Sequence, residues 1–160
     1  MDLVYLETSI VSHATARKSL DPSTAVLQEQ AQRWMAEQRP LFEVITSQLV
    51  IDEASLGDPD AASRRLAMLQ GIPVLSANPD AEVVADEIIS RAMMPAKARL
   101  DALHVATAAL AGVQYLLTQN CSHIANAREL PRVYQLLNEL GLSGMLICTP
   151  VEFLGDQDDR

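Results

Sequence analysis

The stretch LVYLETS at residues 3–9 joins a short apolar run to an acid and two hydroxyl side chains. An apolar run without polar alternation is typical of a parallel strand that is covered on both faces. Glu7 falls at the end of this strand, and in an open α/β sheet ligand sites form outside the carboxyl ends of the strands. We therefore expect a buried parallel strand that carries Glu7 to a candidate site.

Four further β-rich runs follow along the chain, at Phe42–Thr46, Ile72–Leu75, Tyr115–Thr118 and Met145–Thr149. Segments with helical periodicity separate them, and strands that alternate with helices predict a parallel sheet between two helical layers. The sequence thus predicts a three-layer α/β/α sandwich with a central parallel sheet of about five strands, in one domain over residues 1–154. The acidic tail at residues 155–160 is expected to be disordered.

Proline marks the expected helix starts. The pairs Asp21-Pro22, Asp58-Pro59, Asn78-Pro79 and Thr149-Pro150 each place a capping side chain directly before a proline. Such side chains accept hydrogen bonds from free N–H groups, and proline at the first helical position loses no needed donor. Four helix starts follow from this dipeptide, while Gly112 and Gly141 are placed to end two helices.

The composition excludes several classes of protein. The 160 residues are 49% hydrophobic, which is ordinary for a globular domain and argues against disorder. No apolar run approaches the roughly 18 residues of a membrane span, and the start lacks a basic leader, so we expect a cytoplasmic protein. The net charge of −9 argues against a protein that coats nucleic acid. A metal-dependent nuclease stays open, because bound ions reverse the local field.

Four oxygen-bearing residues stand at comparable places in successive units, namely Glu7, Glu53, Asp101 and Asn120. Glu7 and Asn120 each follow a strand-like run, whereas Glu53 and Asp101 are expected in the first turns of helices. Acids gathered at one sheet edge repel one another unless a cation joins them, and oxygen ligands select hard cations such as Mg²⁺ or Mn²⁺. The joint pattern predicts a divalent-metal site.

Each of these residues also has a plain structural interpretation. Glu7 can belong to a helix cap, Glu53 with Asp52 to a solvated pair, Asp101 to a charged surface and Asn120 to a turn. Taken singly, these interpretations compete with the metal site on equal terms or better. Only the joint pattern favours the site.

The histidines and cysteines carry weaker signals. His104 lies one helical turn after Asp101 and is expected to bond to that acid or to pack at the edge of the core. His13 and His123 have no evident partner in the sequence. Cys121 and His123 alone make a poor zinc pattern, so a structural role for Cys121 stands ahead.

The sequence resembles the PIN-domain family, in particular the VapC-type toxins of bacterial toxin–antitoxin systems. The resemblance rests on four loose motifs in the right order, at residues 4–10, 47–53, 101–108 and 116–120. Two positions depart from the family pattern. Glu7 replaces the usual aspartate, and Asn120 lacks the further acid that often follows three residues later, where this chain has His123.

The resemblance implies a Mg²⁺- or Mn²⁺-dependent endoribonuclease that acts as the toxin of a type II toxin–antitoxin pair. It would leave 5′-phosphate and 3′-hydroxyl ends, form a homodimer and be inhibited by a small antitoxin that reaches the site with a basic side chain. Glu7 and Asp101 would be central metal ligands, and Glu53 a ligand or the acceptor that orients water. Asn120 would be a neutral ligand or lie just outside the ligands, and Thr8 and Ser9 would bond to Glu7.

Substrate RNA would follow basic spots, which are Arg64 and Arg65, Lys97 and Arg99, and Arg128 and Arg132. Each spot can equally be a solvated helix face. Two other classes of function stay open. One is a catalytically silent PIN-like module that binds RNA or protein, which the two departures favour. The other is an unrelated small-molecule α/β enzyme, against which the missing glycine-rich phosphate loop counts.

Overall fold

The computed structural model describes residues 1–155, which build a five-stranded sheet. Its strands are β1 (Leu3–Leu6), β2 (Glu43–Ser47), β3 (Val74–Leu75), β4 (Tyr115–Leu117) and β5 (Leu146–Cys148). All pairings are parallel and the strand order is β3-β2-β1-β4-β5. Tyr5 in β1 pairs with Ile45 on one side and Leu116 on the other, so β1 forms the middle of the sheet.

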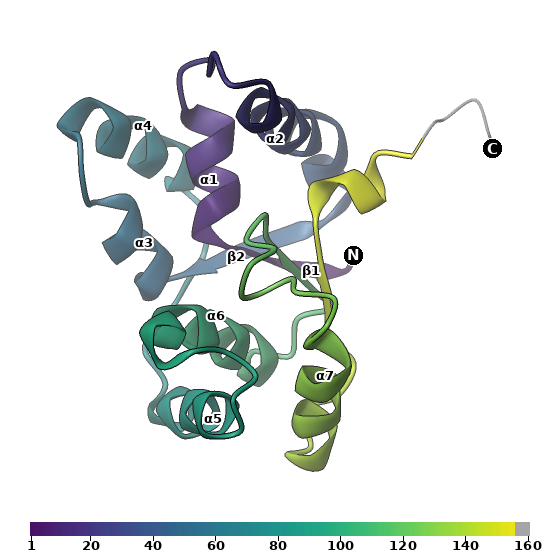
Figure 1. Ribbon diagram of the computed structural model, residues 1–160. Helices are drawn as coiled ribbons and strands as arrows, with labels where there is room; N and C mark the ends of the chain where they lie inside the picture. The colour runs from purple at the N-terminus through teal and green to yellow at the C-terminus, as the bar shows by residue number, and fades with distance from the viewer. Residues whose placement is uncertain (156–160) are drawn as a thin grey trace.

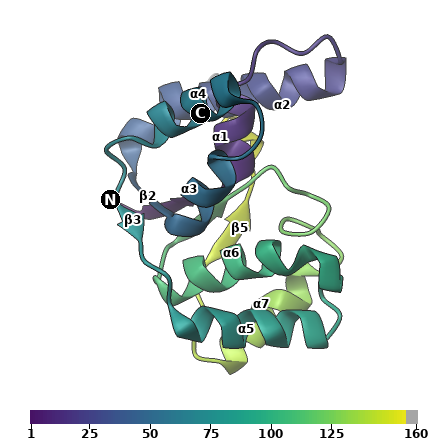
Figure 2. The same ribbon diagram turned by 90° about the vertical axis from the view of Figure 1, so that its left-hand side faces the viewer.

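Helices cover both faces of this sheet. They are α1 (Thr8–Thr15), α2 (Pro22–Arg33), α3 (Gln48–Ala54), α4 (Pro59–Leu69), α5 (Pro79–Ser90), α6 (Arg99–Leu110) and α7 (Leu130–Glu139). Figure 1 shows α1 to α4 on one side of the sheet and α5 to α7 on the other, and Figure 2 shows the same two layers from the side. The predicted three-layer α/β/α sandwich with a parallel sheet is confirmed.

The Asp-Pro and Asn-Pro pairs begin helices as expected. The Asp21 carboxylate accepts from the Thr24 N–H at 3.0 Å, and that of Asp58 accepts from the Ala61 N–H at 2.9 Å. Asn78 caps α5 in the same way, through the Asp80 N–H. The pair at 149–150 begins only a 3₁₀ segment, Pro150–Phe153, so a full helix there is not formed.

Two helices end at the expected glycines. Gly112 and Gly141 follow α6 and α7 with φ angles of +71° and +74°. This left-handed conformation costs glycine little and closes the last turn of a helix. No helix within residues 1–155 is long and apolar enough to cross a membrane. The predicted disorder of the acidic tail concerns residues that lie, from 156 onward, outside the described part of the chain.

The position of Glu53 differs from the prediction. Helix α3 begins at Gln48, directly after β2, and the Ser47 hydroxyl accepts from the Val50 N–H at 3.3 Å. Because α3 is only 7 residues long, Glu53 falls in its last turn and not in its first. The helix dipole therefore does not explain the acid, since negative charge is favoured at the other end.

Candidate active site

Glu7 follows β1 directly and caps helix α1 with its own side chain. One carboxylate oxygen accepts from the Ser9 N–H at 2.5 Å, and the other accepts from the hydroxyls of Ser9 at 2.8 Å and Thr118 at 2.6 Å. The side chain is buried, with the residue 4% exposed. Both oxygens thus have protein donors, and Glu7 ties β1, α1 and the end of β4 together at the carboxyl edge of the sheet.

Glu53 reaches this region from the opposite direction, out of α3. The Thr8 hydroxyl donates to its Oε1 at 2.8 Å, and Nε2 of His104 contacts the same oxygen. The prediction that Thr8 would bond to Glu7 is therefore wrong, whereas the one for Ser9 is confirmed. Thr8 points toward Glu53 because it lies in the first turn of α1, beside α3.

The charge of Glu53 is stabilised by these contacts. Burial by itself would raise the pKa of this carboxyl. The hydrogen bond from His104, its positive charge when that ring is protonated, and the hydrogen bond from Thr8 act in the other direction and prevail. The pKa of Glu53 therefore lies below its ordinary value, and the group is an anion at neutral pH.

His104 is the centre of a buried chain of hydrogen bonds. Its Nδ1 lies 2.8 Å from the Tyr5 hydroxyl, which in turn lies 2.7 Å from the Ser47 hydroxyl. Burial raises the pKa of Tyr5 above its ordinary value, so this hydroxyl keeps its proton. A neutral ring then satisfies every group if Ser47 donates to Tyr5, Tyr5 to Nδ1, and Nε2–H to Glu53.

Of the two roles expected for His104, the bond to Asp101 does not form, because the ring turns inward to Glu53 and is 1% exposed. Asp101 lies in the first turn of α6, as predicted. Its Oδ2 instead lies 2.8 Å from Nδ1 of His123, in the loop after β4. His123 is therefore not isolated. Nor is His13, whose Nδ1 lies 2.7 Å from Oε1 of Gln119 and must donate to that acceptor.

Asn120 behaves as a turn residue. Its side-chain oxygen accepts from the His123 N–H at 3.1 Å, and its own N–H donates to the Thr118 hydroxyl at 3.0 Å. These bonds shape the loop that brings His123 to Asp101. Asn120 thus supports the site through the backbone of this loop, which matches the plain interpretation of the residue.

The hydrogen bonds connect Glu7 with Glu53, whereas Asp101 is connected to them only indirectly. Glu7 and Glu53 are linked through the consecutive residues Thr8 and Ser9, and Glu53 is linked through His104 to the helix that carries Asp101. The hydrogen bonds that Tyr5, His104 and His123 contribute to this region were not predicted from the sequence. A polar residue in an apolar strand, as Tyr5 is, was the available signal for the first of them.

The chemistry of these donors fits a hard cation, but not through all three acids. No group of three or more His, Cys, Asp or Glu side chains within residues 1–155 is arranged to hold a metal ion. Mg²⁺ commonly keeps several waters and binds through one or two carboxylates. Glu53 and Asp101 suit that mode, since each has one oxygen that accepts no hydrogen bond from the described residues. Glu7 is less available, because its carboxylate already accepts three hydrogen bonds from the protein.

The basic spots proposed for RNA are largely used within the protein. Two of the arginines donate to backbone carbonyls, Arg64 to that of Thr15 and Arg65 to those of Ala54 and Leu56. Arg99 pairs with the carboxylates of Glu82 and Asp86. Arg132 donates to the carboxylate of Glu129 and to the backbone carbonyl of Arg91. A guanidinium held in this way has a structural role. The interpretation of these positions as ordinary helix faces is favoured.

The fold of this protein is similar to that of a solved structure. No family model matches the sequence, and no curated protein matches it either. Among solved structures, the crystal structure of VapC20 from Mycobacterium tuberculosis, described as a sarcin–ricin-loop-cleaving toxin, superposes with a TM-score of 0.59. The match covers 78% of this chain and 95% of that one, at 21% sequence identity. The chain has the PIN-domain fold. At this identity the likeness shows the fold, and the roles of individual residues remain predictions.

Proposed function

We propose that this protein is a divalent-metal-dependent endoribonuclease and the toxin of a type II toxin–antitoxin pair. The observation that supports the proposal is the PIN-type fold together with the hydrogen bonds that hold Glu7 and Glu53 on consecutive residues of α1, Ser9 and Thr8, at the end of β1. The similar structure belongs to a toxin that cleaves the sarcin–ricin loop, an RNA target. That likeness supports RNA as the substrate class here.

In this proposal each residue of the site has a separate role. Glu53 and Asp101 would hold the cation, which when bound supplies a water of lowered pKa and stabilises charge at phosphorus. Glu53 can also orient the attacking water through its second oxygen. His104 and Thr8 keep the Glu53 carboxylate ionised and fixed in direction. Glu7 holds the start of α1, and with it Thr8, in place.

The His123–Asp101 pair gives the site a group that the family motif does not predict. With Nδ1 bonded to the carboxylate, the other ring nitrogen of His123 is available for a phosphate oxygen or a leaving group. The side chain is 28% exposed, so such a group can reach it. His123 stands three residues after Asn120, where the family pattern often has an acid, and we propose that it contacts the substrate from there.

A small antitoxin and a homodimeric state complete the proposal, and both rest on the resemblance. The test of the toxin role is co-expression with the neighbouring short reading frame. We expect a stable complex in which RNA cleavage is suppressed. Absence of any small partner, together with harmless expression of the protein alone, would contradict the toxin assignment.

The test of the enzymatic role is RNA cleavage by the purified protein with Mg²⁺ or Mn²⁺. We expect Asp101→Asn and Glu53→Gln to abolish cleavage, and Asp60→Asn, an exposed acid on α4, to leave it unchanged. End analysis should find 5′-phosphate and 3′-hydroxyl groups. Cleavage that survives in both site variants would place the chemistry elsewhere in the molecule.

A second candidate is a PIN-like module that binds RNA or protein without cleaving it. It is favoured by one observation, namely that both oxygens of Glu7 are occupied by protein donors. Such a module would bind RNA equally well in the wild type and in Asp101→Asn, with no metal dependence. A gel-shift titration beside the cleavage assay separates the two functions.

A further inference from the structure

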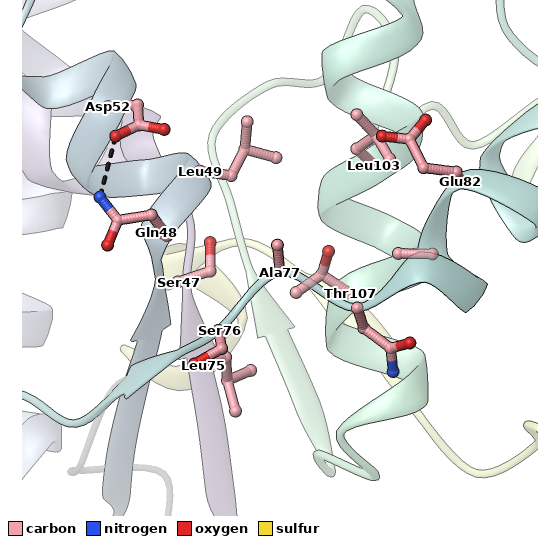
Figure 3. Close-up of a pocket in the computed structure, with 12 residues that line it drawn as sticks. Ser47, Gln48, Leu49, Asp52, Leu75, Ser76, Ala77, Glu82, Leu103 and Thr107 are labelled. Carbon is pink, nitrogen blue, oxygen red and sulfur yellow. Dashed lines mark hydrogen bonds between the residues drawn. The ribbon is translucent and has the colours of Figure 1, made fainter.

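A cavity of about 180 Å³ opens beside the candidate active site. It lies between the start of α3, the segment from β3 into α5, and the outward face of α6 (Figure 3). A water molecule occupies roughly 30 Å³ of the liquid, so this cavity has room for a small ring system. The proposed metal-dependent chemistry leaves it without a role.

The cavity shares its walls with the candidate site. Asp52 and Leu103 line it, and each directly precedes a residue of the site, Glu53 and His104. Ser47 belongs to both, because it lines the cavity and begins the chain of hydrogen bonds to His104. The cavity therefore adjoins the two helices, α3 and α6, that carry Glu53 and His104.

The lining combines apolar walls with unused polar groups. Leu49 and Leu103 face each other across the cavity in Figure 3, and the Thr107 hydroxyl points into the space between the helices. This hydroxyl makes no hydrogen bond with any described residue. At the rim, the Gln48 amide donates to the Asp52 carboxylate at 2.9 Å, which leaves further acceptor positions on that carboxylate.

The charge at the cavity is small for so acidic a protein. Glu82 lines the far wall, but Arg99 pairs with it and with Asp86. Asp52 remains as the one carboxylate of the lining without a cationic partner among the described residues. Apolar walls, a hydroxyl and one carboxylate suit a flat ligand that presents N–H donors, and they disfavour a phosphate.

We propose that this cavity binds a base of the substrate RNA, next to the phosphodiester that is cleaved. Single-stranded RNA is read by bases that are splayed out, placed between apolar or aromatic side chains and hydrogen-bonded along their edges. Guanine fits best, because its Watson–Crick edge presents two adjacent N–H donors to the Asp52 carboxylate. This inference rests on the proposed function, since it deepens the recognition of the same substrate.

Cleavage of matched oligoribonucleotides tests the proposal. The substrates differ only in the bases that flank the cleaved bond, with guanine, inosine or uracil in turn. We expect a preference for guanine in kcat/KM that falls roughly tenfold in Asp52→Asn and in Thr107→Val, in line with the loss of one base contact. Val83→Thr, on the exposed face of α5, is the control and should keep the preference. An unchanged preference in both cavity variants overturns the proposal while leaving the ribonuclease intact.

Binding of free guanosine provides a readout that does not depend on cleavage. In the wild-type protein without added metal, guanosine should shift the NMR methyl signals of Leu49 and Leu103, and it should shift them less in Thr107→Val. Shifts without any RNA cleavage would retain the cavity and refute the proposed function. Shifts caused by an arginine-containing peptide, but not by guanosine, would overturn the proposal in favour of a protein partner.

Discussion

His104 determines what kind of acid Glu53 is. A carboxylate in the last turn of a short helix would ordinarily be a solvated charge of little consequence. Here its partner is a buried imidazole whose other nitrogen is held by Tyr5, so two polar side chains depend on one ring. Buried polar groups that lose a partner cost far more than the hydrogen bond itself contributed.

Replacement of His104 should therefore be costly. We expect His104→Leu to lower the free energy of unfolding by roughly 2–4 kcal/mol, because Tyr5 and Glu53 each lose a partner. His104→Gln keeps a donor and an acceptor and should cost less. Urea denaturation of the two variants measures the difference. Equal losses would mean that the ring matters for its volume alone.

The lowered pKa of Glu53 predicts a pH dependence. A group whose native pKa is depressed adds stability above its unfolded pKa, which is about 4.3 for glutamate, and loses it as the pH falls through the native value. The stability difference between wild type and Glu53→Gln should thus be present at pH 7 and shrink below about pH 4. Urea titrations at both pH values test this. A difference that stays constant would show that Glu53 has no specific partner in the native state.

At the scale of elements, the features that depend on neighbouring residues in the chain were the ones that the sequence predicted. The alternation of strands and helices and three of the four proline-marked helix starts follow from nearest neighbours in the chain, and the structure reproduces them. The position of Glu53 in α3 was not predicted correctly, because Ser47 caps that helix without a proline to mark its start. The partner of His104 lies 51 residues away, and no spacing rule reaches that far.

One helix cap offers a clean test of this local control. Asp58 accepts the Ala61 N–H at the start of α4. Asp58→Ala should lower stability by about 1 kcal/mol, because the first turn loses an acceptor. Asp58→Asn is the matched control and should lose little, since asparagine caps helices about as well. Thermal denaturation resolves the two. A stable Asp58→Ala protein would mean that packing alone holds α4.

At the scale of the whole molecule, the net charge is −9, and we expect a bound cation to increase the free energy of unfolding. Mn²⁺ or Mg²⁺ that binds only the native state raises the melting temperature by mass action. We expect this rise at neutral pH, and we expect Asp101→Asn to reduce it more than Asp60→Asn does. Differential scanning fluorimetry measures both. Equal rises in the two variants would place the bound cation away from Asp101.

The outermost strands of the sheet have a consequence for assembly. β3 has two residues and directly follows Pro73. β5 has three residues and ends at Cys148, two residues before Pro150. Short edge strands flanked by proline offer few unpaired backbone groups to another chain, and this is one way in which proteins avoid edge-to-edge aggregation. Such edges disfavour the extension of this sheet by a second copy. We therefore expect the proposed dimer to form through helix side chains, so that the carboxyl edge of each sheet stays separate from that of the other copy.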